Sequence, residues 1–152
     1  MFGKKLSEYI RFERVILILI AVAFISRLVV GMSGVEIAKA KWVSINVVLL
    51  LGLIYCAVNV HLSGFGSYKQ LFGLLFIQTG FAHLLIASAI LMAVVTGADN
   101  IYTNPEFFNH QNGRNLFHVF MHGVAALILP LISWAIGSAI LFVTRRIKPR
   151  LA

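Results

Sequence analysis

Histidines inside apolar sequence are the residues of this chain that could carry chemistry. His83 lies within one long apolar run, and His118 and His122 lie near the start of another. Imidazole is a good ligand for haem iron, copper and zinc. His118 and His122 are four residues apart, so both project from one face of a helix. These three histidines are therefore the candidates for binding haem b or another metal.

The depth of each histidine along its helix tests the haem hypothesis. At a rise of ~1.5 Å per residue, His83 lies about 21 Å from Gly97. By the same rise, His122 lies about 12 Å from Arg114. If the outer ends of two antiparallel helices are level, the two histidines differ by about 9 Å in depth. We expect this mismatch to be too large for one iron, and His118 to be placed still less favourably.

Other metals could combine His118 and His122 with a donor from the loop before them. The candidate loop donors are Asp99, Glu106 and His110. HxxxH is a weak motif, because it lacks the glutamate of HExxH zinc enzymes. A structural alternative is that the histidines form hydrogen bonds with neighbouring helices or with backbone carbonyls. Proton relay and quinone contact are further alternatives.

Enzymatic catalysis finds little support in the sequence. We find no GxSxG motif, no Walker loop and no paired carboxylates within an apolar run. All five acidic residues are expected outside the apolar segments. A proton-coupled transporter usually carries an acidic side chain within the membrane, so this class is not favoured either.

Four long apolar runs must position the histidines. They cover residues 15–33, 42–62, 71–97 and 116–143. Each is close to or above the ~20 residues that a helix needs to cross a bilayer. The chain is also 60% hydrophobic and only 12% charged. The sequence therefore predicts an all-α bundle of four transmembrane helices, forming a single membrane domain over residues 1–152.

Basic residues gather at the two ends of this chain, whose formal net charge is +8. Cytoplasmic segments of membrane proteins are enriched in lysine and arginine, which predicts an inner-membrane protein with both termini in the cytoplasm. We expect the basic ends to contact anionic lipid head groups. Nucleic acid is not a predicted partner.

Three further polar residues are expected at membrane depth: Arg27, Asn115 and Ser133. Arg27 is expected either to extend to the interface or to pair with Asp99 or Glu106. Asn115 and Ser133 fall near the stripe of the two neighbouring histidines, so they are expected to face the bundle interior.

Local signals add three expectations about the helices and the longest loop. Asn104 followed by Pro105 predicts a short surface helix in that loop. Pro130 predicts a kink in the last span. Ala89, Ala93 and Gly97 form a row of small residues that lets another helix approach closely.

The functional hypothesis from sequence is a non-enzymatic role. The chain is predicted to act as a subunit or accessory component of an oligomer or a larger membrane complex. Its partners would be the lipid bilayer, other membrane subunits or further copies of itself. The alternative is a redox membrane subunit that binds haem or another metal through His83, His118 and His122.

Overall fold

Four long helices make up almost all of the ordered structure. The computed structural model describes residues 1–33, 44–104 and 113–148. The helices are α1 (Leu6–Met32), α3 (Ile45–Leu62), α4 (Tyr68–Thr96) and α5 (Leu116–Ile147). All four are long and apolar enough to cross a membrane. The prediction of an all-helical protein with four candidate spans is confirmed, and the architecture is that of a small multi-pass membrane protein.

Two of the helices extend well beyond the apolar runs that predict them. α1 begins at Leu6 rather than at residue 15, and α5 continues to Ile147 rather than ending at residue 143. Polar residues near a helix end can stabilise it, which an apolar run does not reveal. Glu8 accepts a hydrogen bond from the backbone N–H of Lys5 at 2.7 Å, which caps the start of α1.

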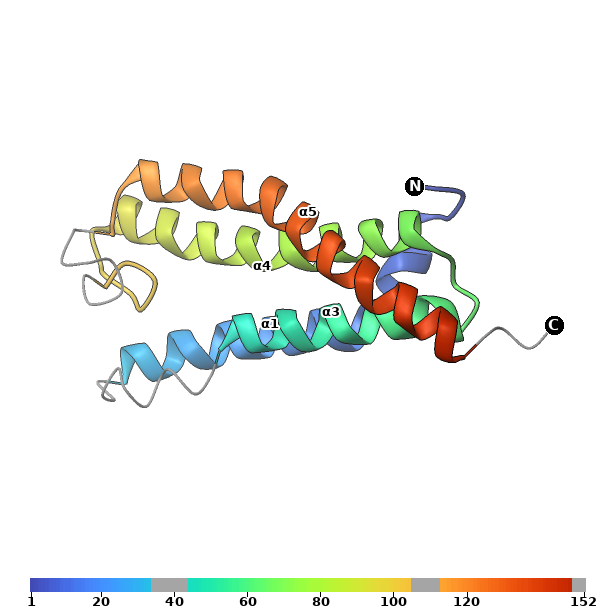
Figure 1. Cartoon of the computed structure of the whole chain (residues 1–152). Helices are drawn as coiled ribbons and strands as arrows, with labels where there is room; N and C mark the ends of the chain where they lie inside the picture. Colours follow the sequence, from blue (N-terminus) through green and yellow to red (C-terminus); the bar gives the residue numbers. More distant parts are fainter. Residues whose placement is uncertain (34–43, 105–112, 149–152) are drawn as a thin grey trace.

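The helices form two adjacent pairs, α1 with α3 and α4 with α5 (Figure 1). The N-terminus and the last turn of α5 lie at one end of the bundle, here called the terminal end. The opposite end carries residues 97–104 and 113–115 and is here called the loop end. The two pairs converge at the terminal end and diverge toward the loop end. Among the described residues, α1 and α5 do not pack against each other.

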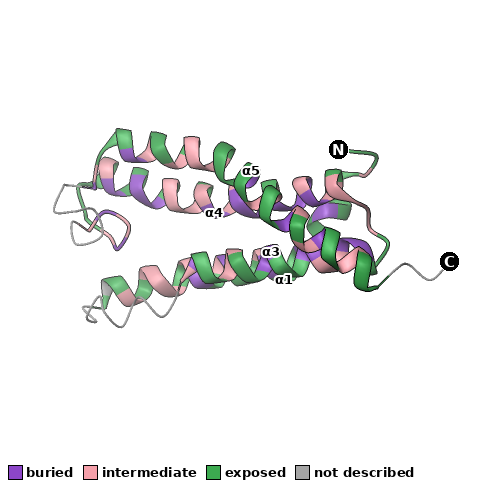
Figure 2. Ribbon diagram, viewed as in Figure 1, coloured by how far each residue is buried: buried purple, intermediate pink, exposed green. Residues whose placement is uncertain are grey.

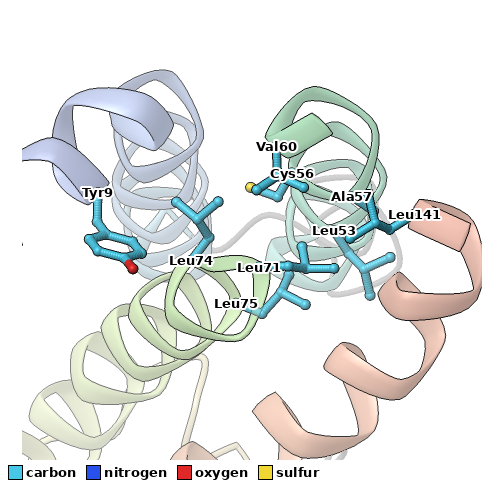
Figure 3. Close-up of a cluster of buried hydrophobic side chains, with 9 residues drawn as sticks. All are labelled: Tyr9, Leu53, Cys56, Ala57, Val60, Leu71, Leu74, Leu75 and Leu141. Atoms are coloured by element: carbon cyan, nitrogen blue, oxygen red, sulfur yellow. The ribbon is translucent and has the colours of Figure 1, made fainter. Parts of the chain in front are cut away.

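A cluster of buried side chains holds the terminal end together (Figure 3). Its members are Tyr9, Leu53, Cys56, Ala57, Val60, Leu71, Leu74, Leu75 and Leu141. Gly137 lets α5 approach this cluster, because an added Cβ would already lie 3.3 Å from Leu75 Cδ1. The Trp134 indole N–H also donates to the Tyr68 carbonyl at 2.8 Å. The second half of α5 is thereby tied to both α3 and α4.

The bend of α5 separates this packed half from the half that carries the histidines. Pro130 lies inside α5, and Figure 1 shows the helix changing direction about halfway along. Proline removes one backbone hydrogen bond and crowds the preceding turn, which accounts for the bend. The first half of α5 can therefore follow α4 away from α1 and α3.

The row of small residues on α4 serves packing within this chain. Ala89 and Ala93 are buried, and Gly97 ends the helix in a left-handed conformation at φ 76°. The Asn100 side chain donates to the Ala89 carbonyl at 2.7 Å, so residues after the helix fold back over it. The expected contact with another helix is not needed to explain the row.

Exposed residues are spread over all four helices (Figure 2), and many of them are large apolar residues. Examples from α1, α4 and α5 are Val15, Val95 and Phe117, each at least 60% exposed. In water such a surface would be a liability. Four helices of spanning length place the same surface against lipid tails, which agrees with the expected contact with a bilayer.

Candidate functional site

Three histidines from two helices meet near the loop end of the bundle. His83 of α4 and His122 of α5 lie with their Nδ1 atoms 2.8 Å apart, so one ring donates a hydrogen bond to the other. Their ring centroids are 5.1 Å apart. The His118 ring also lies 5.1 Å from that of His122. The structure thus brings together all three histidines that the sequence selects.

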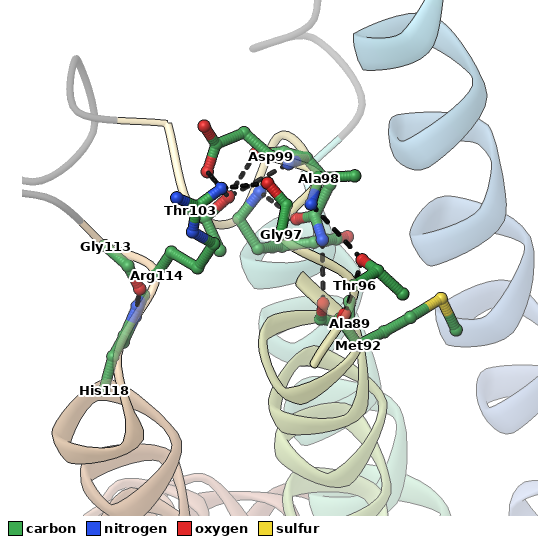
Figure 4. A network of polar contacts seen from close by, with 12 residues as sticks. Ala89, Met92, Thr96, Gly97, Ala98, Asp99, Thr103, Gly113, Arg114 and His118 are labelled. Carbon is green, nitrogen blue, oxygen red and sulfur yellow. Dashed lines mark hydrogen bonds and ion pairs between the residues drawn. The ribbon is translucent and has the colours of Figure 1, made fainter. Parts of the chain in front are cut away.

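The expected difference of about 9 Å in depth between His83 and His122 is wrong. That expectation set Arg114 level with Gly97. In the structure it is the long side chain of Arg114 that reaches the Gly97 carbonyl (Figure 4). The two imidazole rings therefore meet even though their helices place them at different distances from Gly97 and Arg114. His118, expected to be the worst placed, lies directly beside His122.

His118 is held by the start of its own helix. Its backbone N–H donates to the Asn115 side chain at 2.8 Å, so Asn115 caps α5. Its Nδ1 donates to the Gly113 carbonyl at 2.8 Å (Figure 4). A carbonyl can only accept, so the proton of neutral His118 is on Nδ1 and the lone pair is on Nε2. Asn115 is therefore a helix cap, which differs from its expected place on an interior stripe.

The histidines line a cavity of about 360 Å³ where the two helix pairs diverge. All four helices and the loop after α4 contribute to it. Its lining residues are Arg27, Ile45, Asn46, His83, Ile86, Ile101, Tyr102, His118 and His122. The cavity is thus lined by both polar and apolar side chains, in the part of the bundle near the loop end.

Arg27 lies at this cavity, with its guanidinium carbon 5.7 Å from the centre of the Tyr102 ring. The Tyr102 ring in turn stacks on Phe24 at 5.4 Å. Burial raises the pKa of Tyr102 to about 12, and the nearby Arg27 charge opposes this only in part. The Tyr102 hydroxyl is therefore protonated at neutral pH. His122 was expected to point toward His83 or Arg27, and both line the same cavity; Tyr102 was not selected from the sequence.

Asp99, expected to pair with Arg27 or to donate to a metal, pairs instead with Arg114. The Arg114 Nη1 and Asp99 Oδ1 atoms are 3.6 Å apart, and Thr103 Oγ1 donates to the same carboxylate at 3.3 Å. Asp99 does not line the histidine cavity. Two other expected donors, Glu106 and His110, lie outside the described residues, as does the predicted surface helix from Pro105 onward.

Two more polar residues lie away from the cavity. Ser133 is half-buried further along α5 and does not line it. His61 lies near the terminal end, where its Nε2 donates to the Lys148 carbonyl at 2.9 Å. His61 is therefore a structural histidine and a suitable control for the other three.

The expectation that all five acidic residues lie outside the apolar segments is wrong for one of them. Glu13 lies within α1 and is fully buried, with 0% of its surface exposed. The sequence carries a signal for this position, because Tyr9, Glu13, Ile16 and Ile20 recur at helical spacing. The three apolar members of that row are buried with it.

The spacing of the histidine rings is compatible with a shared metal ion. Zinc–nitrogen bonds of ~2.0–2.1 Å in a tetrahedral site put two ligand nitrogens about 3.3 Å apart and two ring centroids about 5 Å apart. The His122 ring already has the second spacing to both the His83 ring and the His118 ring. Among the described residues, however, no three donor atoms converge on one point, so a metal would require the rings to rotate.

A haem between His83 and His122 does not fit this arrangement. A haem with two axial imidazoles needs its flat macrocycle between the rings, whereas these rings form a direct hydrogen bond. Comparison with protein-family models, with curated proteins and with solved structures finds no match for this chain. Any function must therefore be argued from the site itself.

Proposed function

We propose that this protein binds one first-row transition-metal ion, such as zinc or copper, through His83, His118 and His122. The site lies at the loop end of the membrane bundle. The observation that carries the proposal is the contact between His83 and His122, because it puts nitrogen donors from two helices within reach of one ion. Binding rather than catalysis is the role that these residues support.

The hydrogen bond of His118 strengthens the proposal. Metal-binding histidines usually donate their second ring N–H to a carbonyl or a carboxylate, which fixes the tautomer and the ring orientation. His118 makes this contact with Gly113, and its Nε2 is then the nitrogen suited to a metal. A histidine that serves only to cap a helix needs no neighbour of its own kind at 5.1 Å.

Arg27 affects the net charge of the metal complex that the cavity can hold. Its positive charge lies at the same cavity and disfavours an uncompensated dication there. A metal with three neutral imidazole ligands has an open fourth position. An anion such as hydroxide or chloride in that position lowers the net charge and can interact with Arg27. We therefore expect a metal bound together with one small anion.

The predicted role as a subunit or accessory component of a larger assembly stays a prediction. No described contact identifies a protein partner, and a metal-binding subunit would satisfy both hypotheses. An inner-membrane location with cytoplasmic termini likewise stays a prediction from the basic ends of the chain.

Cobalt titration of the purified, chelator-stripped protein in detergent tests the proposal. Co²⁺ replaces Zn²⁺ in imidazole sites and absorbs visible light strongly when its coordination is tetrahedral. We expect saturable binding of one equivalent, reversed by added Zn²⁺. His122→Gln should lose this binding, because an amide is a poor substitute for imidazole.

His61→Gln is the matched control, since His61 is a buried histidine at the other end of the bundle. It should bind cobalt as the unaltered protein does. The proposal is contradicted if the unaltered protein shows no saturable binding, or if His122→Gln binds cobalt with undiminished affinity.

A further inference from the structure

Glu13 is an ionisable side chain without a partner inside the bundle. It is fully buried on the inner face of α1. Within residues 1–33, 44–104 and 113–148, neither of its carboxyl oxygens has a hydrogen-bond partner, and the described ion pairs join other residues. Polar side chains of this kind within a membrane span are rare and commonly functional.

Each packed helix presents a different neighbour to Glu13. α1 itself contributes Tyr9, one turn earlier, and α3 contributes Cys56, which is close enough to interact with it electrostatically. α4 contributes Gln78 to the same inner region. From α5, the cluster around Tyr9 and Cys56 receives the buried Leu141, with Trp134 and Ile140 packed against it. None of these neighbours carries a positive charge.

Four basic residues lie near Glu13 in the sequence or at the terminal end of the bundle, and each of them is exposed or contacts an aromatic ring. Arg11 and Arg14 flank Glu13 on α1 and are exposed. Arg145 lies 4.8 Å above the Tyr68 ring, and Arg146 lies 5.2 Å from the Phe142 ring. Among the residues that the structure describes, a negative charge on Glu13 would thus have no compensating charge nearby.

Gln78 supplies a second unpaired acceptor, near Ile16 and about one helical turn from Glu13 along α1. Its amide N–H donates to the Leu49 carbonyl at 3.3 Å, while its Oε1 is buried without a donor in the described part of the chain. A Cβ added at Gly52 would lie 2.5 Å from that oxygen and 2.7 Å from Ile16 Cγ2. Because Gly52 has no side chain, Gln78 can reach α1 beside it. Gly52 lies about one helical turn, or ~5 Å, from Cys56 along α3.

The Glu13 carboxyl oxygens and Gln78 Oε1 are all hydrogen-bond acceptors without a donor in the described part of the chain. One proton on Glu13 would provide a donor for them. An ionised carboxylate without a partner is very costly in an apolar interior. The neutral acid avoids that cost, and its O–H can donate to Gln78 Oε1 after a side-chain rotation. We propose that Glu13 is a proton-binding site within the membrane span, with Gln78 as the acceptor for its acidic proton.

This site is separate from the histidine site. Gln78 lies about 7.5 Å closer to the terminal end than His83, at ~1.5 Å per residue along α4. On its other side, Tyr9 donates its hydroxyl to the Met1 carbonyl at 3.0 Å. Tyr9 therefore carries a polar group on the side of Glu13 that faces the terminal end.

A purely structural explanation accounts less well for the carboxyl. A buried polar group without a partner destabilises the folded state, and a leucine or methionine would fill the position without that cost. The remaining advantage of glutamate over an apolar residue is that it can take up and release a proton.

Infrared difference spectroscopy tests the proposal directly. We expect the unaltered protein at neutral pH to show the C=O band of a protonated carboxylic acid, which moves in D₂O. Glu13→Gln should lack this band. Glu8→Gln should keep it, because Glu8 is an exposed carboxylate paired with Lys4 at 3.2 Å. If Glu13→Gln instead loses carboxylate bands, Glu13 is ionised and the proposal is wrong.

A second measurement needs no variant. Dicyclohexylcarbodiimide is an apolar reagent that takes the proton of a buried carboxylic acid on one nitrogen. The carboxylate oxygen then adds to its central carbon, and the acyl group moves to nitrogen to give a stable N-acylurea without loss of any atom. Peptide mapping should find the adduct on Glu13, with less labelling as the pH is raised. Labelling confined to exposed carboxyls, together with carboxylate bands assigned to Glu13, contradicts the proposal.

Discussion

His83 and His122, 39 residues apart in the chain, share one hydrogen bond between their Nδ1 atoms at 2.8 Å. One of these nitrogens must carry a proton and the other a lone pair. A metal ion bound by both nitrogens needs both lone pairs. Metal binding must therefore displace the shared proton, either to the other nitrogen of that ring or to solvent.

Zinc affinity should consequently decrease as the solution is acidified. Protons compete with the metal for imidazole lone pairs. Once the histidines begin to protonate, the dissociation constant should rise up to about tenfold per pH unit for each histidine that must lose a proton. Zinc titrations of the purified protein over a series of pH values measure this. An affinity that stays constant into acidic solution would count against histidine ligands.

Gly52→Ala should destabilise the bundle. The new methyl group would meet Gln78 Oε1 at 2.5 Å and Ile16 Cγ2 at 2.7 Å, so α1 and α4 must shift away from α3. Overpacking of this kind typically costs about 1–3 kcal/mol. Thermal unfolding in detergent measures the change.

Gly80→Ala is the matched control, because a Cβ there meets nothing within 4 Å. Alanine is favoured over glycine inside a helix by roughly 0.5–1 kcal/mol, so this variant should be as stable as the unaltered protein or slightly more stable. Equal melting temperatures for the two variants would show that the contact at Gly52 is not tight.

Tyr102→Phe should leave the protein stable, whereas Tyr102→Ala should destabilise it. The Tyr102 hydroxyl is buried without a partner in the described part of the chain, so its removal relieves a cost of about 1–3 kcal/mol. The ring itself stacks on Phe24 with centroids 5.4 Å apart, and alanine loses that packing. A large loss of stability in Tyr102→Phe would reveal a partner for the hydroxyl.

Both chain ends should lie on the same side of the membrane, and residues near Ala98 on the other. Four crossings require this relation, and the basic residues at both ends predict the cytoplasmic side for them. Reporter fusions at the C-terminus and insertions at Ala98 should therefore give opposite signals. The same signal from both positions would rule out four crossings.

The helices were readily predicted, because crossing a bilayer demands long apolar runs that sequence displays directly. Glu13 was missed for a related reason. The apolar run begins at residue 15, and residues 1–14, with four basic side chains, predict an amphipathic segment at the membrane surface rather than part of the span. Only the helical spacing of Glu13 with Tyr9 and Ile16 indicates that it faces the core.

The contact between the histidines depends on geometry that sequence does not display. Their meeting depends on how residues 97–104 fold back over α4 and on where Arg114 lies relative to Gly97. The bend at Pro130 then decides that the first half of α5 follows α4 rather than α1. The residue types could be selected from sequence, whereas their meeting point required the positions of whole helices.

X-ray absorption spectroscopy of the zinc-loaded protein tests the central claim most directly. Three histidine ligands predict a first shell of nitrogen or oxygen at ~2.0–2.1 Å, with the outer-shell scattering that imidazole rings produce. His61→Gln should give the same spectrum, and His122→Gln should lose bound zinc or part of the imidazole signal. A first shell without imidazole scattering, or one that is unchanged in His122→Gln, would contradict a metal site formed by His83, His118 and His122.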